Sequence, residues 1–539
     1  MSIISSLERS FLAALQSTLP SLLPQFLIRQ RWFGGKARSI HSVEVLDVVP
    51  FCFNTLRSYF ILARVRYESG AAETYNIPLV RASSQSSSDP SGLRFRSARL
   101  SEEIVLRDAV TDEQFLTRLL EAIANGVSCC GIGGRIRAVS TLALPSLWQT
   151  SEGALAPSVM KAEQSNSSVV YGKRLVLKIF RRVEEGLNPD LEIGAFLTER
   201  SSFRNVPPLA GFLEYSDDAG HTTSMAVLQG YVANQGDAWQ FTLKALAGYY
   251  GKARQWGGLG ESEMPHTPLL TLCGQLIPEE ARQRIGPYLD SAALLGRRTG
   301  ELHLALASAP DDPHFAPQPF SEANQHELAN SGLQLLRANF DMLRRRTDGM
   351  PDHARQEAVR VLALQEKARQ RFQSLAGLKN SAWVTRIHGD YHLGQVLFTG
   401  SDFVILDFEG EPARPLTERR KKRLPLQDVA GMLRSFHYAA YTPLLRQANA
   451  APMPQDDMQS FGVWAQYWQL WVSAIFLKTY LEVSGNAAFI PQSREDLSLL
   501  LDIYLLDKAV YELGYELNNR PSWVRIPLDG ISQLLQESV

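Results

Sequence analysis

The sequence predicts an α+β protein in which a mixed N-terminal half leads into a mostly helical C-terminal half. In the first half, apolar and polar residues alternate over short segments, as in half-buried strands, at 43–49, 58–67 and 74–80. Beyond about residue 233, apolar residues recur at helical spacing at 241–256, 289–307, 321–346, 355–376, 426–441, 461–483 and 497–518. We therefore expect three parts: a small α+β module, a β-rich part and a helical part, at 1–125, 126–232 and 233–539.

Two helices are expected within the N-terminal module. Residues 7–26 show amphipathic spacing, and Pro20 and Pro24 are expected to interrupt that helix. Residues 105–124 are also expected to be helical and to close the module. The glycine-rich stretch at 126–134 lacks the preceding strand and following helix of a dinucleotide fingerprint, so no cofactor is expected there.

Composition restricts the class of partner. Of the 539 residues, 45% are hydrophobic and 21% are charged, and the net charge is −1. This balance indicates neither a nucleic-acid partner nor an anionic membrane surface. The four cysteines suit neither a zinc site nor a disulfide framework, so a reducing, cytoplasmic location is expected. The N-terminus lacks the features of a signal peptide, and no apolar run of about 18 residues predicts a membrane span.

A lysine within an apolar strand is the first functional signal. Lys178 stands in Leu175-Val-Leu-Lys-Ile-Phe180, where burial of its charge calls for an acidic partner or a phosphate group. A helix opens at 188–190 and carries Glu192 in its first turn. Kinase-like folds hold ATP phosphates with such a strand lysine and helix carboxylate. The alternative for Lys178 is an edge-strand lysine whose ammonium group reaches solvent.

Two neighbouring segments have the positions that an ATP site requires. The polar turn that contains Ser165, Asn166 and Ser167 precedes the lysine strand and could cover phosphates through its backbone N–H groups. The apolar segment 223–232 ends in Gln-Gly-Tyr-Val and could be the hinge that meets adenine; an ordinary sheet strand explains it equally well.

The strongest pattern is His388-Gly-Asp-Tyr-His-Leu-Gly-Gln395 followed by Ile405-Leu-Asp-Phe-Glu409. Asp390 stands in a polar loop, Gln395 follows five residues later, and Asp407 ends an apolar strand. Phosphoryl transfer from a magnesium nucleotide requires such a set. One carboxylate orients and deprotonates the attacking hydroxyl, while an amide oxygen and a second carboxylate hold the metal. Taken singly, each acid could instead be a helix cap or part of a surface ion pair.

These motifs carry a family resemblance. The His-Gly-Asp-x-His-x-x-Gln pattern with a following Asp-x-Glu resembles aminoglycoside-phosphotransferase-like small-molecule kinases. The extended sequence resembles bacterial maltokinases over blocks that run nearly from end to end. Those blocks are 31–36, 163–168, 388–397, 407–416, 428–436 and 507–523. The resemblance implies a bilobal, protein-kinase-like fold with an N-terminal cap subdomain, a β-rich ATP-binding lobe and a mostly helical C-terminal lobe.

The resemblance also assigns roles to residues. Asp390 would be the general base, Gln395 and Asp407 would bind Mg²⁺, and Lys178 would hold ATP phosphates with Glu192 positioning it. His392 and Glu409 would brace the catalytic loop. The reaction implied is ATP-dependent phosphorylation of maltose to maltose 1-phosphate, which feeds α-glucan and glycogen synthesis alongside trehalose synthase.

The sugar site is expected on the last long helix. Lys508, Tyr511 and Tyr515 fall at i, i+3 and i+7 on one helical face, and Arg520 lies just beyond it. Tyrosine rings can cover apolar sugar faces while polar groups bond hydroxyls. The alternative is a helix that simply packs by its tyrosines.

Two other functions remain open at this point. A related sugar kinase such as a glucosamine kinase would use the same phosphate machinery, and its amine-bearing acceptor would require an extra carboxylate, from Glu409, Glu411 or Glu512. An inactive regulatory partner of glucan-synthesis enzymes would not require all of Lys178, Asp390, Gln395 and Asp407.

Overall fold

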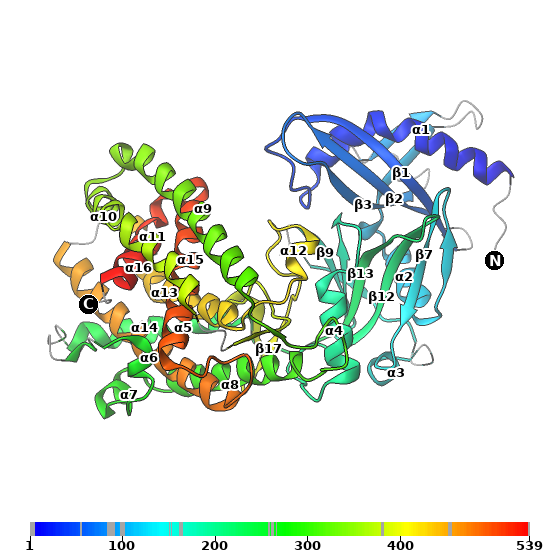
Figure 1. The fold of residues 1–539 in the computed structure, drawn as a ribbon. Helices are drawn as coiled ribbons and strands as arrows, with labels where there is room; N and C mark the ends of the chain where they lie inside the picture. Colours follow the sequence, from blue (N-terminus) through cyan, green and yellow to red (C-terminus); the bar gives the residue numbers. More distant parts are fainter. Residues whose placement is uncertain are drawn as a thin grey trace. The chain divides into compact units, whose positions relative to one another are not determined.

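The chain folds as two compact units, residues 1–233 and residues 234–539. The computed structural model describes residues 6–536, apart from 54–55, 83–91, 97–102, 150, 152, 161–164, 257–258, 260–262, 266, 379–381 and 451–454. The first unit is built on two antiparallel sheets, and the second is mainly helical (Figure 1). The predicted α+β class, with strands first and helices after them, is confirmed.

The first sheet belongs to the N-terminal module. Its strand order is β1-β2-β3-β5-β4, with β11 paired to β3 off that path. The strands are β1 (Ile40–Phe53), β2 (Leu56–Tyr67), β3 (Glu73–Arg81), β4 (Leu93–Arg96), β5 (Glu103–Asp108) and β11 (Arg182–Val183). The alternating segments of the sequence thus form strands, and each is longer at one or both ends than the apolar pattern alone indicates.

Helix α1 (Ser6–Arg29) packs against β1 and buries a row of leucines in the core of this sheet. The helix runs through Pro20 and Pro24 without a break, so the expected interruption is wrong. Each proline removes one backbone hydrogen bond, and burial of the apolar face offsets that cost. The buried leucines are Leu12, Leu15, Leu19, Leu23 and Leu27.

Part of the same helix is unusually apolar. Within the described part of the chain, Phe11–Arg29 is the one helical segment long and apolar enough to cross a membrane. The sequence analysis expected no such segment. Buried helices of globular proteins meet the same length and composition criteria, and 33% of this segment is buried inside the protein.

The expected helix over 105–124 is wrong in its first part. Strand β5 occupies the start of this segment, and the helix α2 (Glu113–Ala124) begins only after Asp112. The Asp112 carboxylate accepts a hydrogen bond from the backbone N–H of Phe115 and caps the helix. Residues before the cap pair with β3 and β4 instead, since their apolar side chains are buried in the sheet.

The second sheet has the order β6-β7-β12-β13-β10-β9-β8. Helices α2, α3 (Leu144–Leu147) and α4 (Pro189–Arg200) contact it, and one buried core joins it to the first sheet. The strands are β6 (Ser128–Cys130), β7 (Gly134–Ser140), β8 (Pro157–Val159), β9 (Asn166–Tyr171), β10 (Leu175–Phe180), β12 (Leu209–Asp217) and β13 (Thr222–Gly230).

The glycine-rich stretch at 126–134 forms the β6–β7 turn. Its backbone N–H groups at Ile132 and Gly133 donate to Oδ1 of Asp47, at 2.9 and 3.2 Å. The Tyr215 hydroxyl donates to the other oxygen of Asp47 at 2.9 Å. The turn therefore holds a carboxylate of its own chain, which links the two sheets.

The second unit is a helical bundle with two small two-stranded sheets, β14–β15 and β16–β17. Helix α14 packs along α8, and α13 lies between α14 and α15. The helices are α5 (Ala238–Trp256), α6 (Leu269–Leu272), α7 (Glu279–Ile285), α8 (Tyr288–Leu306), α9 (Glu322–Arg346), α10 (Asp352–Ala363), α11 (Gln365–Gln373), α12 (Leu416–Arg419), α13 (Leu426–Ala450), α14 (Gln455–Ser484), α15 (Arg494–Asn519) and α16 (Arg525–Gln536). The strands are β14 (Gln318–Pro319), β15 (Trp383–Val384), β16 (Val396–Phe398) and β17 (Phe403–Ile405).

Candidate active site

The loop that carries Asp390 lies in the second unit, between β15 and β16. Gly389 has φ 84°, a left-handed conformation that a residue with a side chain rarely adopts. The backbone N–H groups of His388 and Gly389 donate to the Asp428 carboxylate of α13, at 2.8 and 2.9 Å. The path of the loop is therefore fixed by a buried side chain 38 residues further along the sequence.

Asp428 is itself held in the ionised form. Burial alone would raise the pKa of this carboxyl, but the hydrogen bond from His303 and the two backbone donors hold it below its ordinary value. The Nε2 atom of His303 lies 3.1 Å from Asp428, and its Nδ1 lies 3.1 Å from the Tyr480 hydroxyl. His303 is thus a core histidine that supports the loop from behind.

His388 joins the loop to the end of β17. Its Nε2 lies 2.7 Å from the carbonyl oxygen of Leu406, so Nε2 carries the proton and donates it. Its Nδ1 then accepts the backbone N–H of Asp390, at 3.3 Å. This tautomer, assigned from the hydrogen bonds, makes His388 a bracing residue rather than a base.

Asp390 opens onto a pocket of about 320 Å³ within the second unit. The pocket is lined by segments of α9, α13 and α15, by the catalytic loop and by the turn that contains Glu411. One Asp390 oxygen lies 3.7 Å from the Lys508 ammonium, and the other lies 4.0 Å from Nε2 of His392. A carboxylate at the wall of a pocket, beside a cation, is placed to accept a proton from a bound hydroxyl.

Gln395 and Asp407 lie side by side beyond the loop. The Gln395 amide Nε2 donates to Asp407 Oδ2 at 2.9 Å. Asp407 has φ 63°, a costly backbone conformation for a residue other than glycine, and such strain is concentrated at functional sites. A carboxylate oxygen of Glu409 lies within 4.8 Å of one from Asp407. Two close carboxylates and an amide oxygen form the oxygen-rich set that Mg²⁺ prefers.

Helix α15 contributes part of the expected sugar face to the pocket. Lys508 and Tyr511 line it, with the Lys508 ammonium 5.1 Å from the centre of the Tyr511 ring. Burial, followed by the hydrogen bond that the hydroxyl donates to Glu411, raises the pKa of Tyr511. Asp507 also lines the pocket, and burial raises the pKa of its carboxyl. Glu411 is one of the three acids considered from the sequence for an amine-bearing acceptor, whereas Asp507 was not among them.

Tyr515 and Arg520 lie further along α15 and do not line this pocket. Tyr515 is 46% exposed. The Arg520 guanidinium pairs with Glu516 at 2.6 Å and lies 5.3 Å from the centre of the Tyr515 ring. Their predicted contact with a sugar therefore stays a prediction.

The first unit holds the expected phosphate lysine. Lys178 lies in β10 opposite Ser168 of β9 and Val227 of β13. Its ammonium lies 3.0 Å from the Asp190 carboxylate in the first turn of α4, which Asn188 caps. Glu192 is the partner predicted from the sequence, and Asp190 was not predicted. Glu192 is buried on the same helix, and its positioning role stays a prediction.

One residue of the polar turn predicted to cover the ATP phosphates already makes a contact within the protein. Asn166 and Ser167 begin the strand, and Ser165 precedes it. The Ser167 hydroxyl accepts a hydrogen bond from Arg181 at 2.8 Å. Arg181 is buried, pairs with Asp108 at 2.7 Å and lies 4.4 Å from the centre of the Trp32 ring. Residues 163 and 164 of this motif lie outside the described residues, and phosphate coverage by the turn stays a prediction.

Comparison with known proteins supports the family resemblance. Residues 26–112 match the maltokinase N-terminal cap domain. A glucosamine kinase from Streptacidiphilus jiangxiensis is 23% identical over 384 residues, which cover 70% of this chain and 72% of that protein. A glucosamine kinase from Mycolicibacterium smegmatis is 22% identical over 393 residues, covering 72% of this chain and 82% of that protein. The predicted family resemblance is confirmed at this level.

Solved structures show the same fold. A glucosamine kinase in complex with glucosamine, ADP and inorganic phosphate matches with a TM-score of 0.58 and 18% identity, over 95% of this chain and 98% of that one. A second crystal form of a glucosamine kinase matches with a TM-score of 0.61 and 18% identity, over 98% and 99%. The predicted kinase-like fold with a cap, a strand-rich lobe and a helical lobe is confirmed.

Proposed function

We propose that this chain, a relative of glucosamine kinases that carries the maltokinase N-terminal cap domain, is an ATP- and magnesium-dependent sugar kinase. The observation that carries the proposal is the position of Asp390. Its carboxylate faces a pocket that also presents a lysine, a tyrosine and further polar groups from α9 and α15. A sugar hydroxyl bound there could donate its proton to Asp390 as it attacks a phosphoryl group.

The residues around Asp390 have separable roles in this mechanism. Asp390 orients the acceptor hydroxyl and takes its proton. Lys508, 3.7 Å away, stabilises the carboxylate and can bond a sugar hydroxyl. Asp428 and His388 hold the loop through hydrogen bonds to backbone groups. Because phosphoryl transfer proceeds through a loose transition state, correct positioning of the hydroxyl supplies much of the catalysis.

Two groups of residues are the candidates for binding the metal and the nucleotide. Gln395 and Asp407 would bind Mg²⁺, and their oxygen donors, together with the nearby Glu409, suit this ion. Bound Mg²⁺ neutralises charge on the transferred phosphoryl group. Lys178 would contact ATP phosphates, with Asp190 keeping its ammonium in place.

Maltose is the first candidate acceptor, with the anomeric hydroxyl as the site of phosphorylation. It is supported by the cap domain and by the maltokinase-like sequence blocks that surround Asp390, Glu411 and Lys508. Maltose 1-phosphate would then serve glycogen synthesis. A partnership with trehalose synthase, implied by the sequence resemblance, stays a prediction.

Glucosamine is the second candidate, and one feature of the pocket favours it. Glu411 and Asp507 place two carboxyl groups in the lining, where they could meet the amine of an amino sugar. Of the other two acids considered from the sequence, Glu512 is buried against Arg434 at 2.6 Å, and Glu409 does not line this pocket. The related glucosamine kinases support the same candidate.

An ATP-consumption assay over maltose, glucosamine, glucose and trehalose tests the proposal. We expect magnesium-dependent turnover with one of the first two sugars, and turnover lowered by about 10³-fold in the Asp390→Asn variant. Turnover with maltose and not glucosamine selects the first candidate, and the reverse selects the second. If no sugar supports turnover while ATP still binds, the chain is a regulatory partner and not a kinase.

A further inference from the structure

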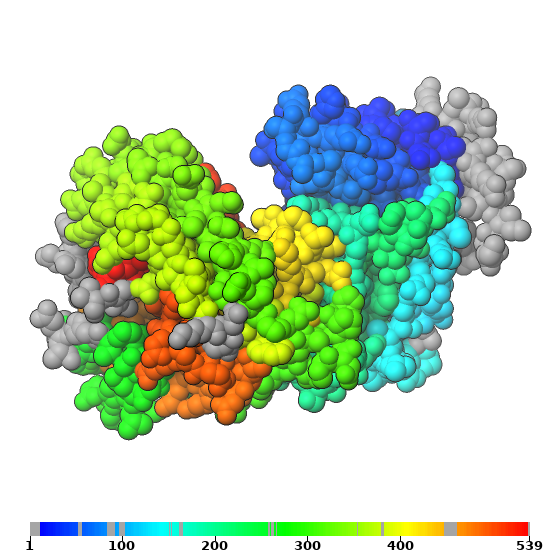
Figure 2. Space-filling view, in the orientation of Figure 1, coloured from blue at the N-terminus to red at the C-terminus, as the bar shows by residue number. Residues whose placement is uncertain are grey.

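The second unit contains another pocket, of about 480 Å³, which the kinase mechanism does not use. It lies between the start of α9, strand β15, the segment that follows α12, and Tyr504 of α15. The yellow segment around α12 lies at the surface in Figure 2. We call this cavity the basic pocket, because of the charges described next.

The lining of the basic pocket is strongly positive. Among the described residues that line it, one is acidic, Glu327, and it pairs with Lys421 at 2.7 Å. Glu418, outside the lining, pairs with Lys421 and with Arg423. Asp312, also outside the lining, is close enough for its charge to act on Lys422. The described lining itself carries one acidic residue and five lysines or arginines, Arg386, Arg420, Lys421, Lys422 and Arg423. The excess of positive charge predicts an anionic ligand.

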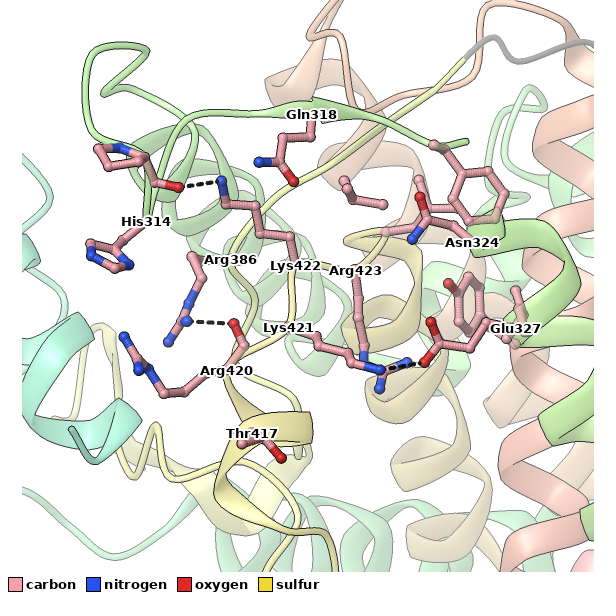
Figure 3. Close-up of a pocket in the computed structure, with 16 residues that line it drawn as sticks. His314, Gln318, Asn324, Glu327, Arg386, Thr417, Arg420, Lys421, Lys422 and Arg423 are labelled. Carbon is pink, nitrogen blue, oxygen red and sulfur yellow. Dashed lines mark hydrogen bonds and ion pairs between the residues drawn. The ribbon is translucent and has the colours of Figure 1, made fainter. Parts of the chain in front are cut away.

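Two of these cations are fixed in place. Arg386 is 3% exposed, donates to the carbonyl oxygen of Arg420 at 2.6 Å and lies 5.8 Å from the centre of the Phe315 ring. The Lys422 ammonium donates to the carbonyl oxygens of Pro313 and Ala316 at 2.8 and 2.7 Å. In Figure 3, Arg386, Lys422, Arg420 and His314 gather on one side of the hollow, and the Lys421–Glu327 pair lies on the other. A rigid, partly buried pair of cations loses little entropy when it binds a phosphate.

The cations also repel one another. Burial first, and then the charge of Arg386, lower the pKa of Lys422, although the charge of Asp312 acts in the opposite direction. An anion bound between them would relieve this repulsion and so gain affinity. The pocket therefore resembles the preorganised donor sets that proteins use for phosphate groups rather than a surface run of solvated lysines.

Uncharged polar groups complete the lining. Gln318, Asn324 and Thr417 offer amide and hydroxyl groups beside the cations. The volume is in the range of small-molecule sites. We propose that the basic pocket binds a small phosphorylated metabolite, with its phosphate at Arg386 and Lys422 and its hydroxyl-bearing body toward Gln318 and Asn324.

The basic pocket is built on segments that also hold the acceptor site. Arg386 lies four residues before Asp390 in the chain. The backbones of Thr385 and Arg423 pair with each other at 2.9 and 2.8 Å, which ties the wall of the basic pocket to the entry of the catalytic loop. Tyr504 lines both pockets. Occupancy of the basic pocket should therefore change the KM for the acceptor.

Calorimetric titration of the full-length protein, without ATP or acceptor, tests the binding. The probes are inorganic phosphate, pyrophosphate and glucose 6-phosphate. We expect glucose 6-phosphate to bind at one site, more tightly than inorganic phosphate, and more weakly as salt is raised. Lys422→Gln should weaken binding at least tenfold. Thr417→Glu, at an exposed position, should abolish binding by adding a carboxylate to the pocket while leaving the melting temperature unchanged.

Lys367→Gln is the matched control. Lys367 also donates to a backbone carbonyl, that of Leu535, but lies outside the basic pocket, so its replacement should leave binding unchanged. Absence of binding by every probe, or binding that survives Thr417→Glu, overturns the site. Binding that is lost in Lys178→Gln instead belongs to the nucleotide site and also overturns it. Because no turnover is measured, these outcomes do not depend on the proposed function.

Kinetics test the link to the acceptor site. Saturating glucose 6-phosphate should change the acceptor KM at least twofold in the wild type and should have no effect in Thr417→Glu. An unchanged KM in a protein shown by calorimetry to bind the probe overturns this link.

Discussion

Each of the two units contains a lysine–aspartate pair, and the pairs differ in the distance between their charged groups and in their exposure to solvent. Lys178 and Asp190 lie 3.0 Å apart with side chains 12% and 1% exposed. Lys508 and Asp390 lie 3.7 Å apart with side chains 30% and 23% exposed. The first pair is closed, because its charged groups lie within hydrogen-bond distance and are shielded from solvent. The second pair is loose and faces a pocket, so its carboxylate remains available to a substrate hydroxyl.

The same two residue types can therefore form a closed ion pair that fixes the lysine, or a loose pair whose carboxylate is open to a ligand. A closed buried pair is costly to break, because the remaining charge loses its partner. A looser and more exposed pair adds little to the free energy of unfolding, so its removal should affect ligand binding or turnover more than stability. The predictions below separate these two roles, in order of decreasing effect.

Asp390→Asn should produce the largest change. Loss of a general base lowers turnover by about 10³-fold, within the usual range for this contribution. Because the pair with Lys508 is loose, the melting temperature should stay within a few degrees of the wild type. Activity is measured by sugar-dependent ADP release, and folding by thermal melting. Wild-type turnover in this variant would contradict the assignment of Asp390.

Lys178→Met should lower both activity and stability. Asp190 would be left buried without the lysine, which costs about 3 kcal/mol. Chemical denaturation of Lys178→Met and of Lys178→Met with Asp190→Leu measures this cost. The double variant should recover stability, because neither charge of this pair remains, but it should not recover turnover. Equal stability of the single variant and the wild type would show that the pair is not closed.

Lys508→Ala should affect the acceptor more than ATP. We expect the acceptor KM to rise about tenfold, the loss of roughly 1.4 kcal/mol of binding, with the KM for ATP unchanged. Steady-state kinetics with each substrate varied in turn provide the test. A larger effect on ATP than on the sugar would place Lys508 at the nucleotide.

Tyr515→Ala should have the smallest effect, less than about twofold on the acceptor KM, because its side chain is exposed and does not line the pocket. Tyr511→Ala is the matched comparison on the same helix and should raise the KM more. A large increase in the acceptor KM for Tyr515→Ala would show that the sugar contacts Tyr515 as well, as the sequence predicts.

The fold could be predicted well where local pattern and tertiary packing agree. Strand alternation and helical spacing identified the sheets and the long helices. The pattern failed at α1, where it predicted breaks at Pro20 and Pro24, and at β5, where it predicted a helix. In both places burial against the first sheet outweighed local preference.

The residue types of the proposed catalytic stretch could be read directly from the sequence. Asp390, Gln395 and Asp407 lie on one short loop and the strand pair that follows, so their types and their spacing are local properties. The family resemblance was equally readable, since it rests on the same blocks.

Contacts between residues far apart in the sequence depend on how the helices and strands pack. Asp190 and Glu192 lie two positions apart and so point to different faces of α4, and the packing of that helix turns Asp190 to Lys178. Tyr515 lies seven residues, about 10 Å along the helix, beyond Lys508, which takes it past the pocket. The residues that line the basic pocket are spread over the sequence from 313 to 504. No local sequence pattern predicts that their charges lie in one cavity.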